Sequence, residues 1–331
     1  MKTLLLQANQ IQTAATILKQ GGLVVFPTET VYGLGANGLD GKAVEKIFSA
    51  KGRPSDNPLI LHIHQESQLD TLVTEVSNEA KQLIKAFWPG ALTLIFRKSG
   101  IVPNEVSAGL STVAIRMPNQ PLALALLEAV NVPLAAPSAN RSGRPSSTTL
   151  AHVMTDLDGR IDAILDGGDT LIGMESTVLD TTTVPFTILR PGSITKAMIE
   201  DVLGQPVLVA TDVPATPKSP GTKYNHYQPI GDLKWYFGEL QAIKQQVSKE
   251  DVVVIAPIEW IDEFEGVRAV SLGSLNDQST MRKEFYSLLR EMDEQHIKRM
   301  ILVTPEKSKL EEDLVDRFEK ASTSSIIVEG K

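Results

Sequence analysis

The feature that most constrains the fold is a change of amino-acid composition near residue 211. Residues 211–231 have the sequence TDVPATPKSPGTKYNHYQPIG, in which proline and glycine interrupt the apolar patterns found on either side. Such a composition is typical of a linker. The chain has 331 residues, and single hydrophobic cores stop growing at roughly 250–300 residues. The sequence therefore predicts two domains, 1–210 and 232–331, joined by a linker over 211–231.

Short apolar runs alternate with segments of helical periodicity throughout the first domain. The runs expected to form strands are 23–26, 59–63, 91–96, 112–117, 132–136, 162–166, 177–180 and 186–190. Helical spacing is found near 11–18, 77–87, 120–130, 148–157 and 194–203. A further helix begins after Asp40 and ends near Lys51, because Pro54 disfavours the helical conformation at the residue before it. This alternation predicts an α/β domain with a twisted, mixed sheet.

Residues 232–331 show the same alternation on a smaller scale. The expected strands are LKWYF, VVVIAP, RAVSL, MILVTP and SIIVEG, and helices are expected near 238–248, 279–295 and 307–321. The pattern predicts a small, Rossmann-like, doubly wound α/β domain. It lacks a G-x-G-x-x-G turn, so the fold alone gives no reason to place a dinucleotide there.

Composition excludes several classes of function. The formal net charge of −8 argues against a surface dedicated to nucleic acid or another polyanion. The chain has no cysteine, which excludes disulfides and thiolate metal sites, and its five histidines are too scattered to indicate a zinc site. The apolar start MKTLLL is not followed by a cleavage site, and no apolar run approaches ~18 residues. We expect a cytoplasmic protein with no membrane segment and no protein-bound metal.

Fixed polar groups are concentrated in KGRPSDNPL, just ahead of an expected strand. Lys51 lies at a helix end and Arg53 is held extended by Pro54, so the two cations can point at one place. Asn57 offers an amide on the same loop. Arginine can contact two phosphate oxygens at once and lysine adds a mobile charge, which suits a polyphosphate. A solvated basic turn explains this segment equally well.

Two expected strands carry polar side chains on one face. The period of two places His62 with Ile60, opposite the leucines of LILHI, and places Arg116 with Thr112, opposite the apolar Val113. A histidine on a sheet face is more often a satisfied polar group than a ligand contact. An arginine among small residues indicates a carboxylate or phosphate partner, although a structural salt bridge is an equal alternative.

Polar loops follow several of the expected strands. They are PTETVYGLG, APSANRSGRPSS, ESTV and LRPGS, together with the lysine and arginine loop above. Each alone is explained by turn chemistry. Five such loops in one domain are better explained by a binding cleft, because open α/β sheets bind ligands at strand ends.

The order of these motifs resembles that of the YrdC-like domain. The segments that carry the resemblance are PTETVYGLG, KGRPSDNPL, STVAIRMP, APSANRSG, ESTVLD and LRPGS. The segment SPGTKYNHYQP is similar to the linker signature of the long, two-domain threonylcarbamoyl-AMP synthases. Thr222 and Gln228 depart from that signature, where the family more often has Met and Ala. The resemblance covers essentially the whole chain and implies a concave ligand cleft in the first domain.

That family condenses L-threonine, bicarbonate or carbon dioxide, and ATP into L-threonylcarbamoyl-adenylate and pyrophosphate. The product feeds the N6-threonylcarbamoyl modification of adenosine 37 in tRNAs that read ANN codons. The resemblance therefore implies ATP as substrate, Mg²⁺ held chiefly by phosphate oxygens, and transfer of the product to the tRNA threonylcarbamoyl transferase machinery. It implies weak or no direct tRNA binding. Neither oligomeric state nor the choice between bicarbonate and carbon dioxide follows from the sequence.

The resemblance also assigns residues to ligands. The expected ATP contacts are Lys51, Arg53, Asn57, Thr112, Ser138, Asn140, Ser146, Arg190, His226 and Tyr227. The expected threonine contacts are Thr30, His62, Arg116 and Ser176. Lys51 and Arg53 are the expected catalytic pair, because they would neutralise charge that moves towards pyrophosphate. Arg116 would hold the threonine carboxylate with two hydrogen bonds.

The linker contains more aromatic and polar side chains than a passive spacer needs. Its two tyrosines and one histidine predict that it folds over the cleft as a lid, with His226 and Tyr227 near the ATP phosphates. The alternative is that these aromatic side chains pack the two domains together.

Two further functions compete with adenylate synthesis. One is an RNA-binding module, since YrdC-like domains present a concave basic surface, but the acidic balance argues against it. The other is a carbamoyl-adenylate enzyme of hydrogenase maturation, but the zinc-finger cysteines and the acylphosphatase region of that larger protein are absent here.

Overall fold

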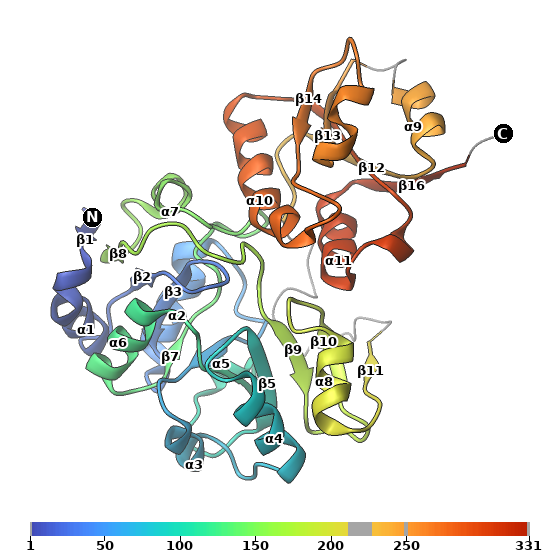
Figure 1. Cartoon of the computed structure of the whole chain (residues 1–331). Coiled ribbons are helices and arrows are strands. Elements are labelled where there is room, and N and C mark those ends of the chain that lie inside the picture. The colour runs from blue at the N-terminus through green and yellow to red at the C-terminus, as the bar shows by residue number, and fades with distance from the viewer. Residues whose placement is uncertain (1, 211–226, 248–250, 330–331) are drawn as a thin grey trace. The chain divides into compact units, whose positions relative to one another are not determined.

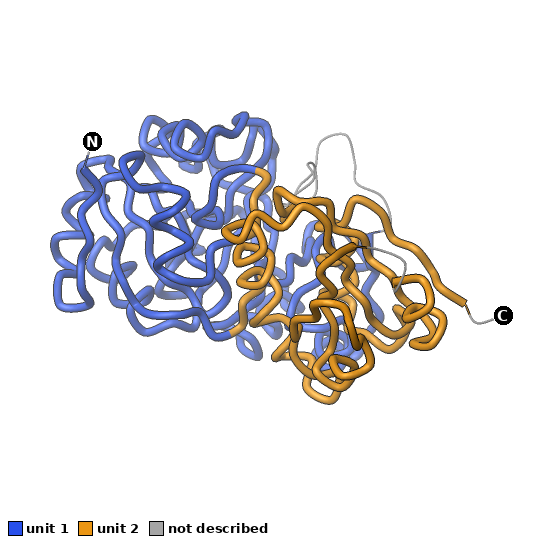
Figure 2. Tube along the Cα trace, turned by 90° about the horizontal axis from the view of Figure 1, so that it is seen from above, with its two compact units in different colours: residues 1–142, 146–171, 175–224 blue, residues 143–145, 172–174, 225–331 orange. Residues whose placement is uncertain are grey.

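The computed structural model describes residues 2–210, 227–247 and 251–329. The chain divides into two compact units (Figure 2). Unit 1 comprises residues 1–142, 146–171 and 175–224, and unit 2 comprises residues 143–145, 172–174 and 225–331. Most of the expected linker lies outside the described residues. Its role as a lid therefore stays a prediction. Its described end, from Tyr227 onward, belongs to unit 2.

A large mixed sheet forms the centre of unit 1 (Figure 1). Its strands are β1 (Leu4–Leu6), β2 (Val24–Phe26), β3 (Gly33–Asn37), β4 (Ile60–His62), β5 (Leu92–Arg97), β6 (Thr112–Arg116), β7 (Leu134–Ala135), β8 (Ala163–Leu165), β9 (Thr177–Asp180), β10 (Thr187–Arg190) and β11 (Leu208–Val209). They follow the order β1-β8-β2-β3-β7-β4-β6-β5-β9-β10-β11. Strand β6 is parallel to β4 and antiparallel to β5, which confirms the mixed sheet.

Helices of unit 1 connect these strands. They are α1 (Ile11–Lys19), α2 (Gly41–Lys51), α3 (Leu69–Leu72), α4 (Asn78–Phe87), α5 (Asn104–Ser107), α6 (Pro121–Val130), α7 (Leu150–Leu157) and α8 (Lys196–Leu203), with 3₁₀ turns at Ala8–Gln10 and Glu66–Gln68. The Asp40 side chain caps α2 by accepting hydrogen bonds from the Lys42 and Ala43 N–H groups. Gly52, at φ +64°, ends it. Within the described residues no helix is long and apolar enough to cross a membrane.

One loop prediction was wrong. PTETVYGLG was expected to be a loop throughout, but its last residues begin β3, which pairs with β2. The sequence did not predict this strand because it contains Gly33 and Gly35, and glycine is unfavourable in strands. Gly35 is needed there, since a Cβ on it would lie 2.8 Å from the Phe26 ring.

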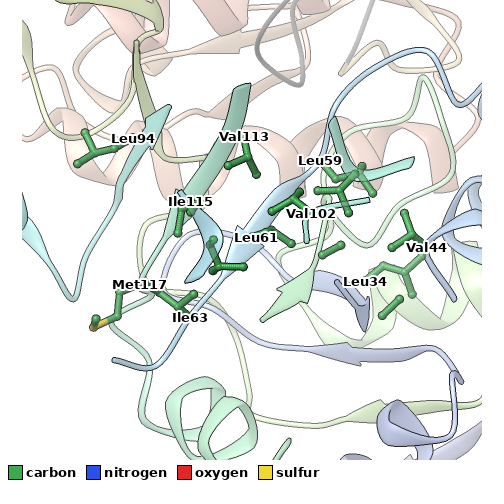
Figure 3. Packing of buried hydrophobic residues seen from close by; sticks show 14 of the residues in the cluster. Leu34, Val44, Leu59, Leu61, Ile63, Leu94, Val102, Val113, Ile115 and Met117 are labelled. Atoms are coloured by element: carbon green, nitrogen blue, oxygen red, sulfur yellow. The ribbon is translucent and has the colours of Figure 1, made fainter. Parts of the chain in front are cut away.

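The two faces of β4 and β6 differ as predicted. Leu61 and Ile115, which are fully buried, belong to the large apolar core on one face of the sheet (Figure 3). Ile60 and Ala114 belong to a separate, small apolar cluster with residues of β5 and β9. His62 and Arg116 have the same strand parity as that second pair. Their side chains therefore leave the sheet on the face opposite the large core.

Unit 2 is built on a parallel sheet. Its strands are β12 (Asp232–Gly238), β13 (Val253–Ala256), β14 (Ala269–Ser271), β15 (Arg299–Thr304) and β16 (Ser324–Val328), in the order β14-β13-β15-β12-β16. Its helices are α9 (Leu240–Val247), α10 (Gln278–Glu294) and α11 (Glu312–Ala321), with 3₁₀ turns at Ile258–Glu263 and Lys307–Lys309. Trp235 of β12 packs on Phe318 of α11, whereas Tyr236 joins the cluster of Ile243 on α9. Helices on both faces confirm the doubly wound prediction.

Close backbone packing at Gly192 gives a test of the fold. A Cβ at this position would lie 2.4 Å from the Thr177 N and 2.8 Å from the Ser176 carbonyl carbon. We expect Gly192→Ala to lower the free energy of unfolding of unit 1 by about 1–3 kcal/mol, because neither backbone atom can move freely. The matched control is Gly100→Ala, whose Cβ would meet nothing within 4 Å. Calorimetric unfolding measures both, and equal midpoints for the two variants would contradict the packing.

Candidate active site

Strands β4 and β6 bring two predicted site residues together. Their parallel register pairs His62 with Arg116 and Ile60 with Ala114. His62 and Arg116 are therefore neighbours on one face, and each is less than 5% exposed. The sequence predicted the face of each residue but not that their strands are adjacent.

The Arg116 guanidinium is held from three sides. Its Nε donates to the Gly90 carbonyl at 3.1 Å, and its Nη1 donates to the Thr30 hydroxyl at 2.8 Å. Its Nη2 lies 2.7 Å from Glu29 Oε1. The structural salt bridge, which the sequence left open as an alternative, is therefore present, and its carboxylate is that of Glu29.

Sequence reasoning missed Glu29. Its side chain is 5% exposed, and both of its carboxylate oxygens lack a hydrogen-bond partner among the described residues. The Nη2 of Arg116 lacks one too. The two charges are therefore in contact without the alignment of a hydrogen bond. The available signal was the position of Glu29 directly before Thr30 in PTETVYGLG.

Hydrogen bonds within the loop fix the neighbours of Glu29. The Thr28 hydroxyl donates to the Val31 carbonyl at 2.6 Å and lies 2.8 Å from the Thr30 hydroxyl. A hydroxyl has one proton, so Thr30 is the donor in the contact between the two threonines. Thr30 therefore accepts from Arg116 and donates to Thr28, which sets the direction of this hydrogen-bond chain.

His62 is a neutral imidazole. Burial, followed by the positive charge of Arg116, lowers its pKa to about 3. Its Nδ1 lies 3.3 Å from the Ile60 carbonyl, and its ring meets the Phe26 ring edge-on at 6.0 Å. His62 therefore supplies a polar, uncharged wall beside Arg116 at neutral pH.

Ser176 and Arg190 are joined directly. The Arg190 Nε donates to the Ser176 carbonyl at 3.0 Å, and its Nη2 donates to the Ser176 hydroxyl at 3.1 Å. The Ser176 hydroxyl also lies 2.7 Å from that of Thr93 on β5. Because Gly192 lets the LRPGS loop lie against residues 175–177, Arg190 of β10 reaches Ser176 at the start of β9. Ser176 was predicted to contact threonine and Arg190 to contact ATP, so this pair connects the two predicted ligand regions.

Lys51 organises the loop that follows β7. Its Nζ donates to the Ser138 carbonyl at 2.5 Å and to the Asn140 carbonyl at 2.7 Å. The same loop contacts PTETVYGLG, since the Ala139 N–H donates to the Tyr32 carbonyl at 2.8 Å. The Lys51 ammonium group, which was predicted to contact phosphates, lies at the end of α2. Two main-chain oxygens of the loop after β7 hold it in place.

Arg53 and Asn57 follow on the adjacent turn. The Arg53 Nη2 donates to the Asn57 carbonyl at 3.4 Å. The Asn57 side chain is fully buried, and neither its Oδ1 nor its Nδ2 has a hydrogen-bond partner among the described residues. Buried amides are normally satisfied, so the Asn57 amide is a candidate contact for a polar ligand group.

Two more predicted ATP contacts are buried in unit 1. The Ser146 hydroxyl donates to the Glu175 carboxylate, one residue before Ser176. Thr112 is 7% exposed at the start of β6 and pairs with Arg97 of β5. Ser146 therefore links the loop after β7 to the Ser176 region.

Neither predicted linker contact belongs to the described part of unit 1. His226 lies outside the described residues. The Tyr227 ring is 4% exposed, stacks on Tyr286 of unit 2 at 5.3 Å and lies 5.3 Å from the Arg317 guanidinium carbon. Its contact with ATP stays a prediction.

The arrangement suits the binding of anions. Arg116, Arg190, Lys51 and Arg53 are cationic and at least nine-tenths buried, which strengthens their attraction for carboxylate and phosphate groups. The described residues include no cluster of three or more His, Cys, Asp or Glu side chains that could hold a metal ion.

Comparison with known families covers both units. The Sua5/YciO/YrdC family, described as telomere recombination, matches residues 16–192. The C-terminal domain of threonylcarbamoyl-AMP synthase matches residues 194–323.

Individual relatives agree with these matches. A threonylcarbamoyl-AMP synthase of Pyrococcus abyssi is 41% identical over 331 residues, covering 96% of this chain and 95% of the relative. One of Bacillus subtilis is 47% identical over 297 residues, covering 87% of this chain and 86% of the relative. The crystal structure of P. abyssi Sua5 complexed with L-threonine superposes with a TM-score of 0.91 at 39% identity, covering 99% of this chain and 100% of that chain. The chain therefore belongs to the threonylcarbamoyl-AMP synthase family.

Proposed function

We propose that this chain is an L-threonylcarbamoyladenylate synthase. It condenses L-threonine, bicarbonate or carbon dioxide, and ATP into L-threonylcarbamoyl-AMP and pyrophosphate. The observation that carries the proposal is the gathering of buried cations and hydroxyls in the strand-end loops of unit 1. Arg116 donates to Thr30, and Arg190 donates to Ser176. Ser146 donates to Glu175, next to Ser176, and Lys51 holds the loop after β7.

The threonine end of the site is formed by Thr30, His62, Arg116 and Ser176. Arg116 uses two of its five N–H groups in hydrogen bonds, so its Nη1 and Nη2 can each donate to one oxygen of the threonine carboxylate. The neutral His62 and the Ser176 hydroxyl offer polar partners for the threonine hydroxyl. This division follows from charge, because only Arg116 in this group is a cation.

The ATP end of the site takes the triphosphate. Its members are Lys51, Arg53, Asn57, Thr112, Ser138, Asn140, Ser146 and Arg190, with the linker residues His226 and Tyr227 as further ATP contacts. Mg²⁺ enters with ATP, held chiefly by phosphate oxygens. Lys51 and Arg53 are the catalytic pair, since they oppose the charge that develops on pyrophosphate as it leaves.

The chemistry needs positioning more than proton transfer. Once the threonine ammonium has lost a proton, the amine forms a carbamate, with loss of water from bicarbonate or of a proton when carbon dioxide reacts. The carbamate oxygen then attacks the α-phosphate of ATP and displaces pyrophosphate. Buried cations bring these anions together and stabilise the charge of the transition state. The site contacts described above supply that function without a nucleophilic side chain.

The product is the donor for N6-threonylcarbamoylation of adenosine 37 in tRNAs that read ANN codons. We place the reaction in the cytoplasm, where tRNA and ATP are found. The adenylate passes to the tRNA threonylcarbamoyl transferase machinery, and the chain itself needs no direct contact with tRNA.

Substrate dependence tests the activity. Pyrophosphate release from ATP should require both threonine and bicarbonate. Valine, which has a methyl group in place of the hydroxyl, should be a poor substrate, because each buried polar group left unpaired costs about 1–3 kcal/mol. The enzyme should discriminate less strongly against serine, which keeps the hydroxyl group, than against valine. Turnover that ignores bicarbonate would refute the activity, and equal turnover of valine and threonine would refute the threonine pocket.

Mutations at the two ends of the site should affect the binding of different ligands. We expect Arg53→Ala to impair ATP use while threonine binding persists, and Arg116→Ala to weaken threonine binding. Arg116→Lys should not restore it fully, because a lysine cannot donate to both carboxylate oxygens from a planar group. Titration calorimetry with each ligand measures the split.

Arg97→Ala is the matched control for this pair, since Arg97 is exposed at the end of β5. It should leave both affinities unchanged. If the Arg53 and Arg116 variants lose both ligands equally while remaining folded, the assignment of the two ends is wrong.

Burial of His62 predicts a pH dependence of stability. Its ordinary pKa is about 6.5, and in the folded chain it is about 3. Below pH 6.5 the unfolded chain therefore binds a proton that the folded chain rejects, and this contribution to stability falls as the pH drops towards 3. We expect His62→Asn to lose less stability than the wild type between pH 7 and pH 5 in urea unfolding. The control His296→Asn alters an exposed histidine and should follow the wild type. If the stability of His62→Asn fell with pH as steeply as that of the wild type, the burial of a neutral His62 would be contradicted.

A further inference from the structure

Glu29 is a buried carboxylate whose hydrogen-bonding capacity is unused. It is 5% exposed, and neither oxygen has a hydrogen-bond partner among the described residues, although Arg116 Nη2 is only 2.7 Å away. A carboxylate can accept about four hydrogen bonds, and leaving such a group unsatisfied in the interior is costly. The neighbouring hydrogen bonds of Thr28 and Thr30 hold its loop in place. Glu29 is therefore a fixed acceptor that fits a donor from a ligand.

The charges at this end of the site also require an anion. A threonine zwitterion brings a carboxylate for Arg116, but its ammonium group needs a negative partner when it leaves water. Thr30 and Ser176 are uncharged, and the lowered pKa keeps His62 neutral. Glu29 is the acidic side chain in contact with Arg116.

The distances match a single α-amino acid. Its ammonium nitrogen and its carboxyl carbon are two bonds apart, about 2.5 Å from standard backbone dimensions. A carboxylate bound to Nη1 and Nη2 of Arg116 therefore leaves its ammonium group beside the guanidinium. Glu29 Oε1, 2.7 Å from Nη2, lies in that neighbourhood.

We propose that Glu29 binds the α-ammonium group of L-threonine and so makes this site specific for amino acids over hydroxy acids. The inference rests on the proposed function. The competing explanation is a purely structural ion pair, in which Glu29 only orients Arg116. The two differ in one respect: a structural pair affects every ligand carboxylate equally, whereas an ammonium contact affects only ligands that carry the amine.

A cycle of two ligands and two proteins separates these explanations. The ligands are L-threonine and (R)-3-hydroxybutyrate, which keeps the carboxylate, hydroxyl and methyl groups but lacks the amine. The proteins are the wild-type full chain and Glu29→Gln, with affinities from titration calorimetry. Wild type should prefer threonine by about 10- to 100-fold, the range of a charge-assisted hydrogen bond. Glu29→Gln should lose most of that preference, because its affinity for threonine falls while its affinity for hydroxybutyrate persists.

Each other outcome has a defined meaning. Equal losses for both ligands, or a preference unchanged in Glu29→Gln, would overturn the ammonium contact while leaving the synthase proposal intact. A wild type that binds both ligands equally would overturn it without any variant. A wild type that binds no threonine would refute the synthase proposal and this inference together.

Two further variants keep the test decisive. Glu29→Asp retains the charge on a shorter side chain, so it should give an intermediate preference even if the glutamine variant is unstable. Asp180→Asn neutralises another buried carboxylate, one that accepts from Thr182 at the end of β9. It should keep the wild-type preference whatever it does to stability.

Discussion

The contact between the Arg116 guanidinium and the PTETVYGLG loop is the interaction on which the site depends. A buried cation is stable only when neighbouring groups compensate its lost hydration. Here the compensation comes from the Gly90 carbonyl, the Thr30 hydroxyl and the Glu29 carboxylate. These partners leave Nη2 without a hydrogen bond. The same contacts that make burial tolerable therefore keep one end of the guanidinium available for a substrate.

Sheet register extends this arrangement across unit 1. Pairing of β4 with β6 sets His62 beside Arg116, and pairing of β5 with β9 brings Thr93 to Ser176. Ser176 then meets Arg190, and the adjacent Glu175 meets Ser146. Sites on strand ends are held more rigidly than sites on long loops. A reaction that depends on aligning a carbamate with a phosphate benefits directly from that rigidity.

Local patterns predicted most of the longer strands and helices, and the face on which His62 and Arg116 lie, because period and capping are short-range properties. The end of α2 near Lys51 was predicted from Pro54 in this way, and the structure adds Gly52 as its C-terminal cap. The short elements β1, β11, α3 and α5 were not predicted. The strand order was not predicted either, since it depends on pairings between distant segments. Strand β3 was missed because its glycines have low strand propensity yet are needed for close packing on Phe26. Glu29 was missed because only the folded chain shows that its carboxylate is buried without hydrogen bonds.

A structure of this chain with L-threonine and a non-hydrolysable ATP analogue would test the central claim most directly, namely that one sheet face holds both substrates. The account predicts the threonine carboxylate within hydrogen-bond distance of Arg116, and the triphosphate on Lys51 and Arg53. It also predicts that Ser176 and Arg190 lie between the two ligands. Threonine bound away from Arg116, or the nucleotide bound to the parallel sheet of unit 2, would contradict it.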